Sequence, residues 1–337
     1  MGESTAHRVS FLNRNDKPFH VVISQQFDRE SIDSLCHLAD MMRSISETKE
    51  GMQFLNSLLR HKRAMLYFTQ PSTRTFLSFA SACQIVGIPY NEVRDASVSS
   101  EIKGESEADT VRVLSQYFDM IIMRHPGEGF AEDMARNLSI PIINGGSGRD
   151  QHPTQALLDI YTLKRCFAGD LSSKTITFVG DLKRGRTVRS LSYLLCKYPN
   201  LHLNFVAPPN LQMGDDILDH LNEAGTRWLA HNKLTNDLIA KSDALYMTRL
   251  QDEWGDEDFN YEDFSISAEQ SQHFKPRLAI MHPLPRRKEL DRALDNTPYA
   301  KYWDQVKNGM WMRSAILAYI FGMEPQIMNH YYEVYLR

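Results

Sequence analysis

Short apolar runs take turns with helical patterns along most of this 337-residue chain, and this alternation restricts the possible folds strongly. The run Ala64–Phe68 precedes an apolar stripe at helical spacing over 76–83, and the run Thr175–Val179 precedes another over 188–195. Strands that alternate with helices form parallel sheets, because a parallel connection has to cross over the sheet. We therefore expect an α/β fold in which two parallel sheets carry helices on both faces.

The chain is long enough for two domains of roughly 150 residues each. The other expected strands are 89–93, 120–123, 141–143, 203–206, 244–247 and 278–281, and the other expected helices are 32–42 (capped by Asp28), 106–117, 215–224 and 310–321. The last of these helices is apolar nearly all round, so we expect it to return to the first half. The predicted domains are 1–154 with 306–337, and 155–305, bridged by helices.

The composition excludes several classes of protein. A net charge of -4 without a basic run argues against binding to nucleic acid. No stretch reaches the ~20 apolar residues of a membrane span, and the N-terminus lacks the apolar core of a signal peptide. The four cysteines, Cys36, Cys83, Cys166 and Cys196, are far apart and form no C-x-x-C motif. We expect reduced core cysteines in a cytoplasmic protein, without membrane or nucleic-acid partners.

Three hydroxyl groups and a guanidinium stand between the first apolar run and its helix, at Ser72, Thr73, Arg74 and Thr75. The first N–H groups of a helix lack intrahelical partners, and the helix dipole is positive at that end. Arginine adds a charged donor fork, so the segment is suited to phosphate. The alternative is that Ser72 or Thr73 only caps the helix and that Arg74 is a solvated surface charge.

Two further polar clusters follow predicted strands in the first half. Arg124 comes directly after 120–123, and a glycine-rich turn after 141–143 leads to His152, Pro153 and Gln155. Proline is favoured as the first residue of a helix, which places His152 at the cap and Gln155 over the same face. Such a pair could polarise a carbonyl and hold an amide. The alternative is that His152 only caps the helix.

The second half carries a segment that nearly matches the nucleotide-binding G-x-x-x-x-G-K-[ST] pattern, at 180–187. Arg186 stands where that pattern needs lysine, which favours bidentate binding of a carboxylate or phosphate. Arg249 follows the run 244–247. After 278–281 come two prolines within four residues, which should hold the backbone extended and leave its carbonyl groups free to accept from a ligand.

Four arginines therefore lie at the ends of predicted strands: Arg74, Arg124, Arg186 and Arg249. Ligands of open α/β sheets bind at these strand ends. The pattern predicts substrates that carry several negative charges, divided between the two halves.

Six motifs in order resemble those of the aspartate and ornithine carbamoyltransferase family over about residues 22–322. They are Ser72-Thr73-Arg74-Thr75, Met123-Arg124-His125-Pro126, His152-Pro153-Thr154-Gln155, Gly180-Asp181-Leu182-Lys183 with Gly185-Arg186-Thr187, Met247-Thr248-Arg249 with Gln251, and His282-Pro283-Leu284-Pro285-Arg286. Ornithine enzymes usually have cysteine where Pro283 stands, so the chain is more similar to the aspartate branch. The resemblance implies carbamoyl transfer from carbamoyl phosphate to L-aspartate, without a metal or other cofactor.

The resemblance also implies roles for single residues. The residues expected to hold the phosphate group are Ser72, Thr73, Arg74 and Thr75. Those expected at the carbonyl oxygen are Thr75, Arg124 and His152, which together with Arg74 are the expected catalytic residues. Those expected to bind the carbamoyl amine are Gln155 and the carbonyl groups of Pro283 and Leu284. Those expected to bind aspartate are Lys103, Arg186, Arg249 and Gln251.

A neighbouring subunit would contribute Ser99 and Lys103 from a loop over 95–107, which has almost no apolar anchor and is expected to be mobile. The resemblance therefore implies a homotrimer or a dimer of trimers, and it allows a regulatory chain as a further partner.

The chain departs from the family pattern at several positions. Gln70 and Trp254 replace a glutamate and an arginine that pair in aspartate enzymes, and Ile102 replaces a second lysine. The acidic segment 252–263 could repel aspartate or attract a cationic amine, unless it faces solvent. A carbamoyltransferase for a different amine therefore stays an alternative. A nucleotide-binding protein or an inactive homologue would leave most of the six motifs unexplained.

Overall fold

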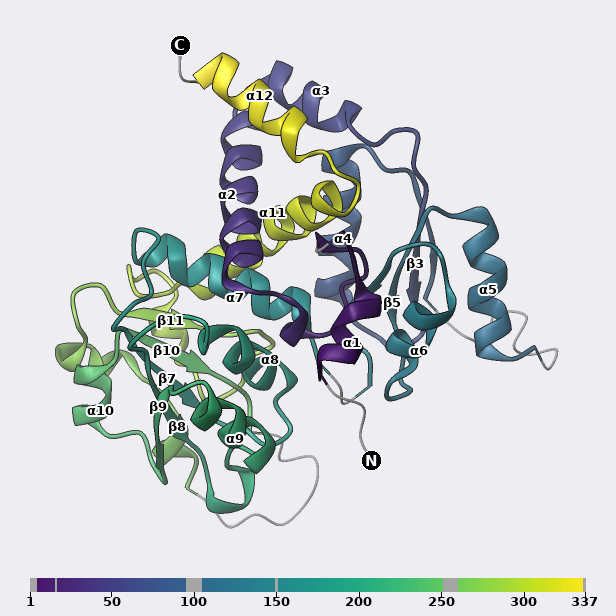
Figure 1. The fold of residues 1–337 in the computed structure, drawn as a ribbon. Helices are drawn as coiled ribbons and strands as arrows, with labels where there is room; N and C mark the ends of the chain where they lie inside the picture. The colour runs from purple at the N-terminus through teal and green to yellow at the C-terminus, as the bar shows by residue number, and fades with distance from the viewer. Residues whose placement is uncertain (1–4, 16, 95–104, 149–150, 251–259, 336–337) are drawn as a thin grey trace. The chain divides into compact units, whose positions relative to one another are not determined.

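The computed structural model describes residues 5–15, 17–94, 105–148, 151–250 and 260–335 (Figure 1). The chain divides into two compact units, Met1–Leu157 with Gly309–Arg337 (unit 1) and Leu158–Asn308 (unit 2). Two helices, α7 (Pro153–Cys166) and α11 (Tyr302–Ile320), contain the boundaries between the units. None of the helices in the described ranges combines the length and apolar character needed to cross a bilayer.

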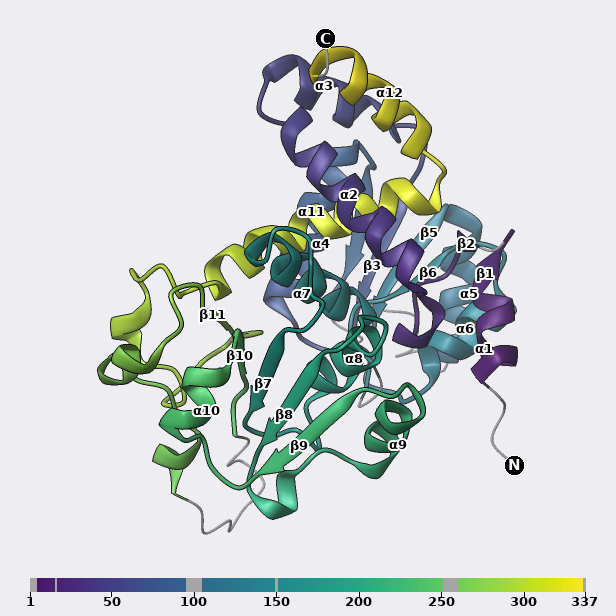
Figure 2. The same cartoon turned by 60° about the vertical axis from the view of Figure 1, so that its left-hand side comes forward.

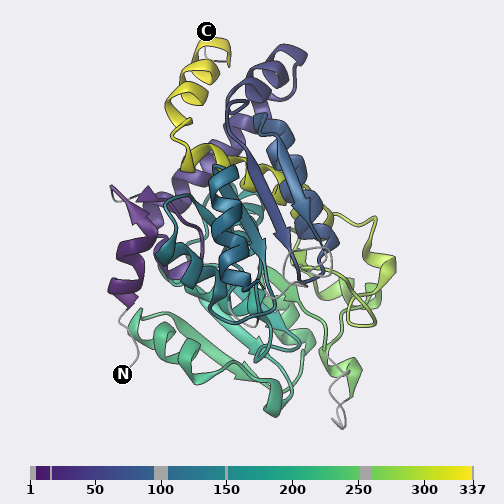
Figure 3. The ribbon, with the colours of Figure 1, turned by 90° about the vertical axis from the view of Figure 1, so that its right-hand side faces the viewer.

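Unit 1 contains a four-stranded parallel sheet in the order β4-β3-β5-β6. Its strands are β3 (Ala64–Phe68), β4 (Tyr90–Val93), β5 (Met120–Arg124) and β6 (Ile142–Asn144), and its other elements are α1 (Thr5–Leu12), β1 (Asn13–Arg14), β2 (Lys17–Pro18), α2 (Arg29–Ile45), α3 (Lys49–Ser57), α4 (Thr73–Val86), α5 (Glu107–Tyr117), α6 (Phe130–Asn137) and α12 (Glu324–Tyr335). The chain runs from β3 to β4 at the sheet edge, and then returns past β3 to β5 on its other side. Right-handed crossovers therefore place α4 on one face of the sheet and α5 and α6 on the other. Figure 3 faces the side that α5 covers.

Unit 2 contains a five-stranded parallel sheet in the order β11-β10-β7-β8-β9. Its elements are β7 (Thr175–Val179), α8 (Arg186–Leu195), β8 (His202–Val206), α9 (Asp215–Glu223), β9 (Arg227–His231), α10 (Asn236–Lys241), β10 (Ala244–Met247) and β11 (Ala279–Met281). The direction of the crossovers reverses after β9, so α8 and α9 lie on one face and α10 on the other (Figure 2). Both predicted parallel sheets are confirmed.

The core strands lie where the sequence predicts them, because they are continuous buried apolar runs. All five residues of β3 are buried, and Asp28 caps α2 by accepting a hydrogen bond from Ser31 N–H at 2.8 Å. The expected helix 106–117 is confirmed, because Ser106 caps α5 and Glu107 opens it. The edge strand β9 was missed, as were α1, α3, α6, α10 and α12, and α11 begins at Tyr302 rather than near 310.

The four cysteines are free thiols, as expected. Cys36 and Cys83 are buried in the core, but Cys166 and Cys196 are only half-buried, which corrects the expectation that all four are core residues. Burial raises the pKa of the Cys83 thiol to about 12 and that of Cys166 to about 11. Thiols with such raised pKa values are poor nucleophiles at neutral pH.

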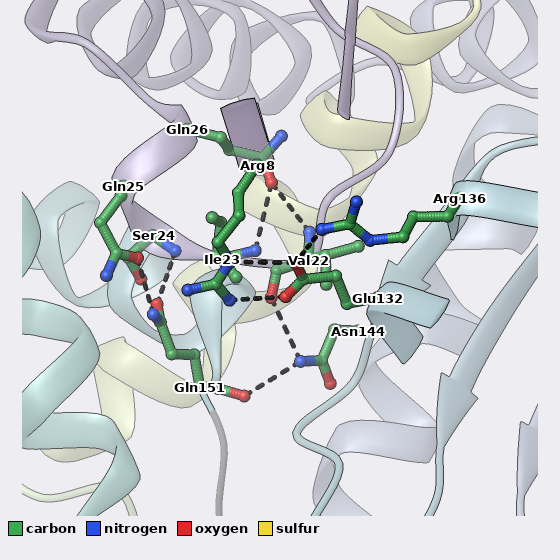
Figure 4. Close-up of polar contacts among 10 residues, drawn as sticks. All are labelled: Arg8, Val22, Ile23, Ser24, Gln25, Gln26, Glu132, Arg136, Asn144 and Gln151. Atoms are coloured by element: carbon green, nitrogen blue, oxygen red, sulfur yellow. Dashed lines mark hydrogen bonds and ion pairs between the residues drawn. The ribbon is translucent and has the colours of Figure 1, made fainter. Parts of the chain in front are cut away.

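The N-terminal helix α1 is fastened to α6 by a carboxylate with two cationic partners (Figure 4). Glu132 accepts from Arg8 Nε at 2.9 Å and Nη2 at 2.5 Å, and from Arg136 Nη2 at 3.1 Å. Burial on its own would raise the pKa of Glu132, but the hydrogen bonds and charge of Arg8, and then of Arg136, outweigh it and lower the pKa.

We expect Glu132→Gln to lower the free energy of unfolding by about 1–2 kcal/mol at pH 7. Because the folded-state pKa of Glu132 lies below its unfolded value of roughly 4.3, this stabilisation is present above that pH and is lost as the pH falls further. Urea unfolding at pH 7 and at about pH 3.5 measures the difference, with exposed Glu333→Gln as the control. Equal losses at both pH values would contradict the assignment.

Candidate active site

The predicted phosphate segment lies at the N-terminus of α4 in unit 1. Ser72 is the N-cap residue with φ of -164°, yet its hydroxyl makes no capping hydrogen bond to the helix. Thr73, Arg74 and Thr75 form the first turn, where Thr73 and Arg74 are exposed and Thr75 is buried. Side-chain capping therefore does not occupy the Ser72 hydroxyl, and the helix end presents N–H groups beside a guanidinium.

Arg124 is brought next to this segment by strand pairing. It is the last residue of β5, directly opposite Phe68 in the register with β3. Just beyond that pair, Gln70 N–H donates to the Arg124 carbonyl at 3.0 Å. The first two predicted clusters of unit 1 thus lie at the ends of adjacent parallel strands.

Arg124 and His152 meet at a glycine. A Cβ atom on Gly146 would lie 2.8 Å from Arg124 Nη1, 2.7 Å from His152 Cδ2 and 3.0 Å from His152 Nε2. Gly146 also has φ of +96°, where side chains are rarely tolerated. The absence of a side chain at this position therefore lets the guanidinium and the imidazole approach the same point.

Asn144 holds this glycine turn with all four of its hydrogen-bonding positions. Its Oδ1 accepts from the N–H groups of Gly146 and Ser147, each at 2.8 Å. Its Nδ2 donates to the carbonyls of Val22 and Gln151, each at 3.2 Å (Figure 4). Because Gln151 immediately precedes His152, Asn144 ties the turn to the chain that carries the histidine.

Gln151 continues this network toward the segment before α2. Its Oε1 accepts from Ser24 N–H at 2.7 Å, and its Nε2 donates to Gln25 Oε1 at 2.6 Å (Figure 4). The glycine-rich turn is visible in the sequence, but the supporting roles of Asn144, Gly146 and Gln151 were missed. The only available signal was an asparagine that immediately follows a buried strand and precedes glycines, which is typical of a side chain bonded to its own turn.

His152 stands at the start of α7, whose first residue is Pro153 as predicted. The His152 carbonyl accepts from Ala156 N–H at 3.1 Å, so the backbone begins the helix while the buried ring lies against Gly146. Gln155 lies in the first turn and is half-buried. The imidazole is therefore directed to the cluster with Arg124 and does not merely end a helix.

In unit 2, the ends of β7 and β10 approach closely at another glycine. A Cβ atom on Gly180 would lie 2.3 Å from the Thr248 carbonyl oxygen, and Gly180 has φ of +122°. The Thr248 hydroxyl donates to the Val179 carbonyl at 3.0 Å. This contact places the segment that leads to Arg186 beside the one that carries Arg249.

Arg186 is the first residue of α8, and the loop before it is closed by Asp181. The buried Asp181 Oδ1 accepts from Arg184 N–H at 2.9 Å, and a Cβ atom on Gly185 would lie 2.5 Å from the Asp181 carbonyl oxygen. The loop wraps on its own backbone, and Arg186 and Arg249, both half-buried, follow neighbouring strands.

Pro283 and Leu284 follow β11, the strand next to β10. The expectation of an extended backbone here was wrong, because Leu284 has φ of +55°. The reason is a hydrogen bond from Leu284 N–H to His282 Nδ1 at 2.7 Å, which turns the chain back on the preceding residues. The carbonyl groups of this segment are therefore placed by a turn.

A buried carboxylate lies under the strand ends of unit 2. Asp159 Oδ2 accepts from the Tyr246 hydroxyl at 2.7 Å, and Oδ1 accepts from Gln305 Nε2 at 2.6 Å. Burial and then the charge of Asp159 raise the pKa of Tyr246 far above its ordinary value, so the phenol stays protonated and donates. Gln305 Oε1 in turn accepts from His282 N–H at 2.9 Å.

Several predicted positions lie outside the described residues: Ser99, Ile102, Lys103, Gln251, Trp254 and the acidic segment up to residue 259. The described candidates form two clusters. Unit 1 brings together Ser72, Thr73, Arg74, Thr75, Arg124, His152 and Gln155, and unit 2 places Arg186, Arg249, Pro283 and Leu284 at the ends of three adjacent strands.

Residues 20–165 match the family domain described as "Aspartate/ornithine carbamoyltransferase, carbamoyl-P binding domain", and residues 172–320 match "Aspartate/ornithine carbamoyltransferase, Asp/Orn binding domain". A chloroplastic aspartate carbamoyltransferase of Pisum sativum is 40% identical over 303 residues, which are 88% of this chain and 77% of the relative. An aspartate carbamoyltransferase catalytic subunit of Methanosarcina mazei is 37% identical over 90% of this chain and 97% of its own length.

A solved structure of Trypanosoma cruzi aspartate transcarbamoylase, in complex with aspartate and phosphate, superposes with a TM-score of 0.81. The two sequences are 37% identical, and the match covers 88% of this chain and 94% of the Trypanosoma cruzi chain. The two family domains follow one another along the chain, and together with these relatives they cover nearly all of it. The chain belongs to the aspartate/ornithine carbamoyltransferase family.

Proposed function

We propose that this protein transfers the carbamoyl group of carbamoyl phosphate to the amino group of L-aspartate, giving N-carbamoyl-L-aspartate and phosphate in pyrimidine biosynthesis. The observation that carries this proposal is the meeting of Arg124 and His152 at Gly146, with Arg124 on the strand next to the one that leads to the helix N-terminus at Ser72–Thr75. That arrangement offers phosphate donors and carbonyl donors side by side, as a dianionic mixed anhydride requires.

In unit 1, the phosphate group binds to Ser72, Thr73, Arg74 and Thr75. Arg124, His152 and Thr75 donate to the carbonyl oxygen, on which negative charge develops when the amine attacks. A preorganised donor at such an oxygen contributes about 3–4 kcal/mol to the stabilisation of the transition state. Gln155 accepts from the carbamoyl amine.

In unit 2, Arg186, Arg249 and Gln251 bind the two carboxylates of aspartate, and Lys103 of a neighbouring subunit joins them. The guanidinium groups suit carboxylates because each presents two parallel donors. The carbonyl groups of Pro283 and Leu284 accept from the carbamoyl amine. The name of the Trypanosoma cruzi relative, which includes both aspartate and phosphate, supports this assignment of two anions.

The reaction needs only bond exchange at one carbon. The amine nitrogen forms a bond to the carbonyl carbon, the carbon–oxygen bond to phosphate breaks, and the departing phosphate takes the amine proton. Alignment of the two substrates and charge complementarity supply the rate acceleration. An essential protein base, detected in the pH–rate profiles of variants, would contradict this route.

The proposed assembly is a homotrimer or a dimer of trimers in the cytoplasm, with Ser99 and Lys103 serving a neighbouring subunit. The catalytic-subunit name of the Methanosarcina mazei relative supports a possible regulatory chain. Full turnover by a strictly monomeric preparation would contradict active sites that are shared between subunits.

A panel of amines incubated with carbamoyl phosphate tests the proposal. We expect aspartate to give the fastest release of phosphate, with the ureido product formed in equal amount, and ornithine to give little, because arginines face the second substrate. Tight binding of the bisubstrate analogue N-phosphonoacetyl-L-aspartate is the matching equilibrium measurement. Faster turnover with a cationic amine would instead establish a carbamoyltransferase of different specificity.

A further inference from the structure

Two motif histidines each accept a backbone hydrogen bond at Nδ1. His282 Nδ1 accepts from Leu284 N–H at 2.7 Å, and His125 Nδ1 accepts from Gly127 N–H at 3.0 Å. A ring nitrogen that accepts a hydrogen bond carries no proton, so in the neutral ring the proton resides on Nε2. Both rings are 2% exposed. The two histidines therefore support backbone turns.

A glutamate faces the second nitrogen in each case. His282 Nε2 donates to Glu289 Oε1 at 2.9 Å, and His125 Nε2 lies 3.0 Å from Glu107 Oε1. The pair of His282 and Glu289 is completely enclosed, whereas the Glu107 side chain is half exposed. A carboxylate that accepts from Nε2 fixes both the tautomer and the orientation of the ring.

Glu289 also organises its own turn. Its Oε1 accepts from Arg287 N–H at 2.8 Å in addition to His282. Burial on its own would raise the pKa of Glu289, but the hydrogen bonds from His282 and Arg287 lower it, so the group is an anion at neutral pH. The chain from 282 to 289 thus closes on one buried carboxylate.

The residue at the end of this chain of contacts is Leu284, which adopts φ of +55° without being glycine. A leucine in the left-handed region is strained and persists only where its surroundings determine it. The hydrogen bond from its N–H to His282 is such a determinant. The orientation of the neighbouring carbonyl groups, at Pro283 and Leu284, therefore depends on the ring of His282 and through it on Glu289.

We propose that Glu289 is a positioning residue for the carbamoyl group: it holds His282, which holds the turn whose carbonyl groups accept from the carbamoyl amine. This inference rests on the proposed function, and it adds a residue that lies outside the six motifs. It predicts that Glu289 affects binding of the carbamoyl moiety and leaves the phosphate segment of unit 1 unaffected.

The test compares Glu289→Gln with Glu289→Met. Glutamine keeps an oxygen that can accept from His282 and Arg287, and methionine has similar length but no such acceptor. We expect Glu289→Met to weaken carbamoyl phosphate binding by about ten-fold or more, and Glu289→Gln to keep it within about three-fold. Inorganic phosphate is the control ligand, with a Kd expected to stay within about two-fold in both variants.

The outcomes separate the possibilities. The proposal would be overturned if Glu289→Met weakened the binding of carbamoyl phosphate and of phosphate equally, or weakened neither. It would also be overturned if Glu289→Gln bound carbamoyl phosphate as weakly as Glu289→Met does. If Glu289→Met does not fold, His282→Asn and His282→Leu test the same link, because asparagine can accept from the N–H two residues later. His282→Asn should then bind carbamoyl phosphate more tightly than His282→Leu. Failure of the wild-type protein to use carbamoyl phosphate would instead contradict the proposed function itself.

Discussion

Replacing Gly146 by alanine should lower kcat by about 100-fold or more in a protein that still folds. The added Cβ would lie 2.8 Å from Arg124 Nη1 and 2.7 Å from His152 Cδ2, so at least one of these side chains has to move. Removal of a single preorganised donor from a developing oxyanion costs about 100- to 1000-fold in kcat. Displacement of the guanidinium or the imidazole should therefore cost a comparable factor, measured by steady-state kinetics at saturating substrates.

Gly169→Ala is a matched control for the backbone effect. Gly169 has φ of +89°, close to the +96° of Gly146, but a Cβ there meets nothing within 4 Å. The strain of alanine at positive φ should cost each variant about 1 kcal/mol of stability, and Gly146→Ala adds the contact with Arg124 and His152. Only Gly146→Ala should lower kcat. Equal effects of the two substitutions on kcat, or none at Gly146, would show that Arg124 and His152 do not act together.

The parts of the fold that the sequence predicted are those governed by local patterns. Buried apolar runs predicted β3 and β7, and the polar residues that follow such runs predicted the clusters at the strand ends. The strand β9 has no fully buried residue and lies at the sheet edge, so it lacks the hydrophobic signal. The N-terminus of α11 was missed because its first turn buries the polar Gln305 and exposes the apolar Trp303, so hydrophobicity does not report which face is buried.

The supporting residues of the candidate site could not be predicted, because their partners are distant in sequence. Asp159 contacts Tyr246, 87 residues away, and Gln305, 146 residues away. Asn144 reaches back 122 residues to Val22. No periodicity or motif reports such contacts. The residues that would touch substrate belong to short motifs at strand ends, whereas those that hold them in place depend on tertiary packing.

Asp159→Asn should lower the free energy of unfolding by about 2–4 kcal/mol, the largest stability effect that we expect from a change this small in volume. Tyr246 and Gln305 each present a hydrogen-bond donor to Asp159. Gln305 cannot reverse its amide, because its oxygen accepts from His282 N–H at 2.9 Å. Asparagine has one acceptor oxygen, which Gln305 occupies, so its NH2 group has to donate to the Tyr246 oxygen. The Tyr246 O–H then loses the acceptor that it has in Asp159, in a site where Asp159 is 0% exposed.

Thermal unfolding measures this prediction, with about 2–4 °C expected per kcal/mol for a unit of this size. The control is Asp237→Asn, which removes a carboxylate from an exposed ion pair with Lys241 and should change stability by less than about 0.5 kcal/mol. The same substitution at Asp159 should also weaken the binding of carbamoyl phosphate, because Gln305 accepts a hydrogen bond from the backbone N–H of His282. An Asp159→Asn protein as stable as the wild type would mean that the buried acid accepts only one hydrogen bond. In that case the support under β10 and β11 would have to come from packing alone.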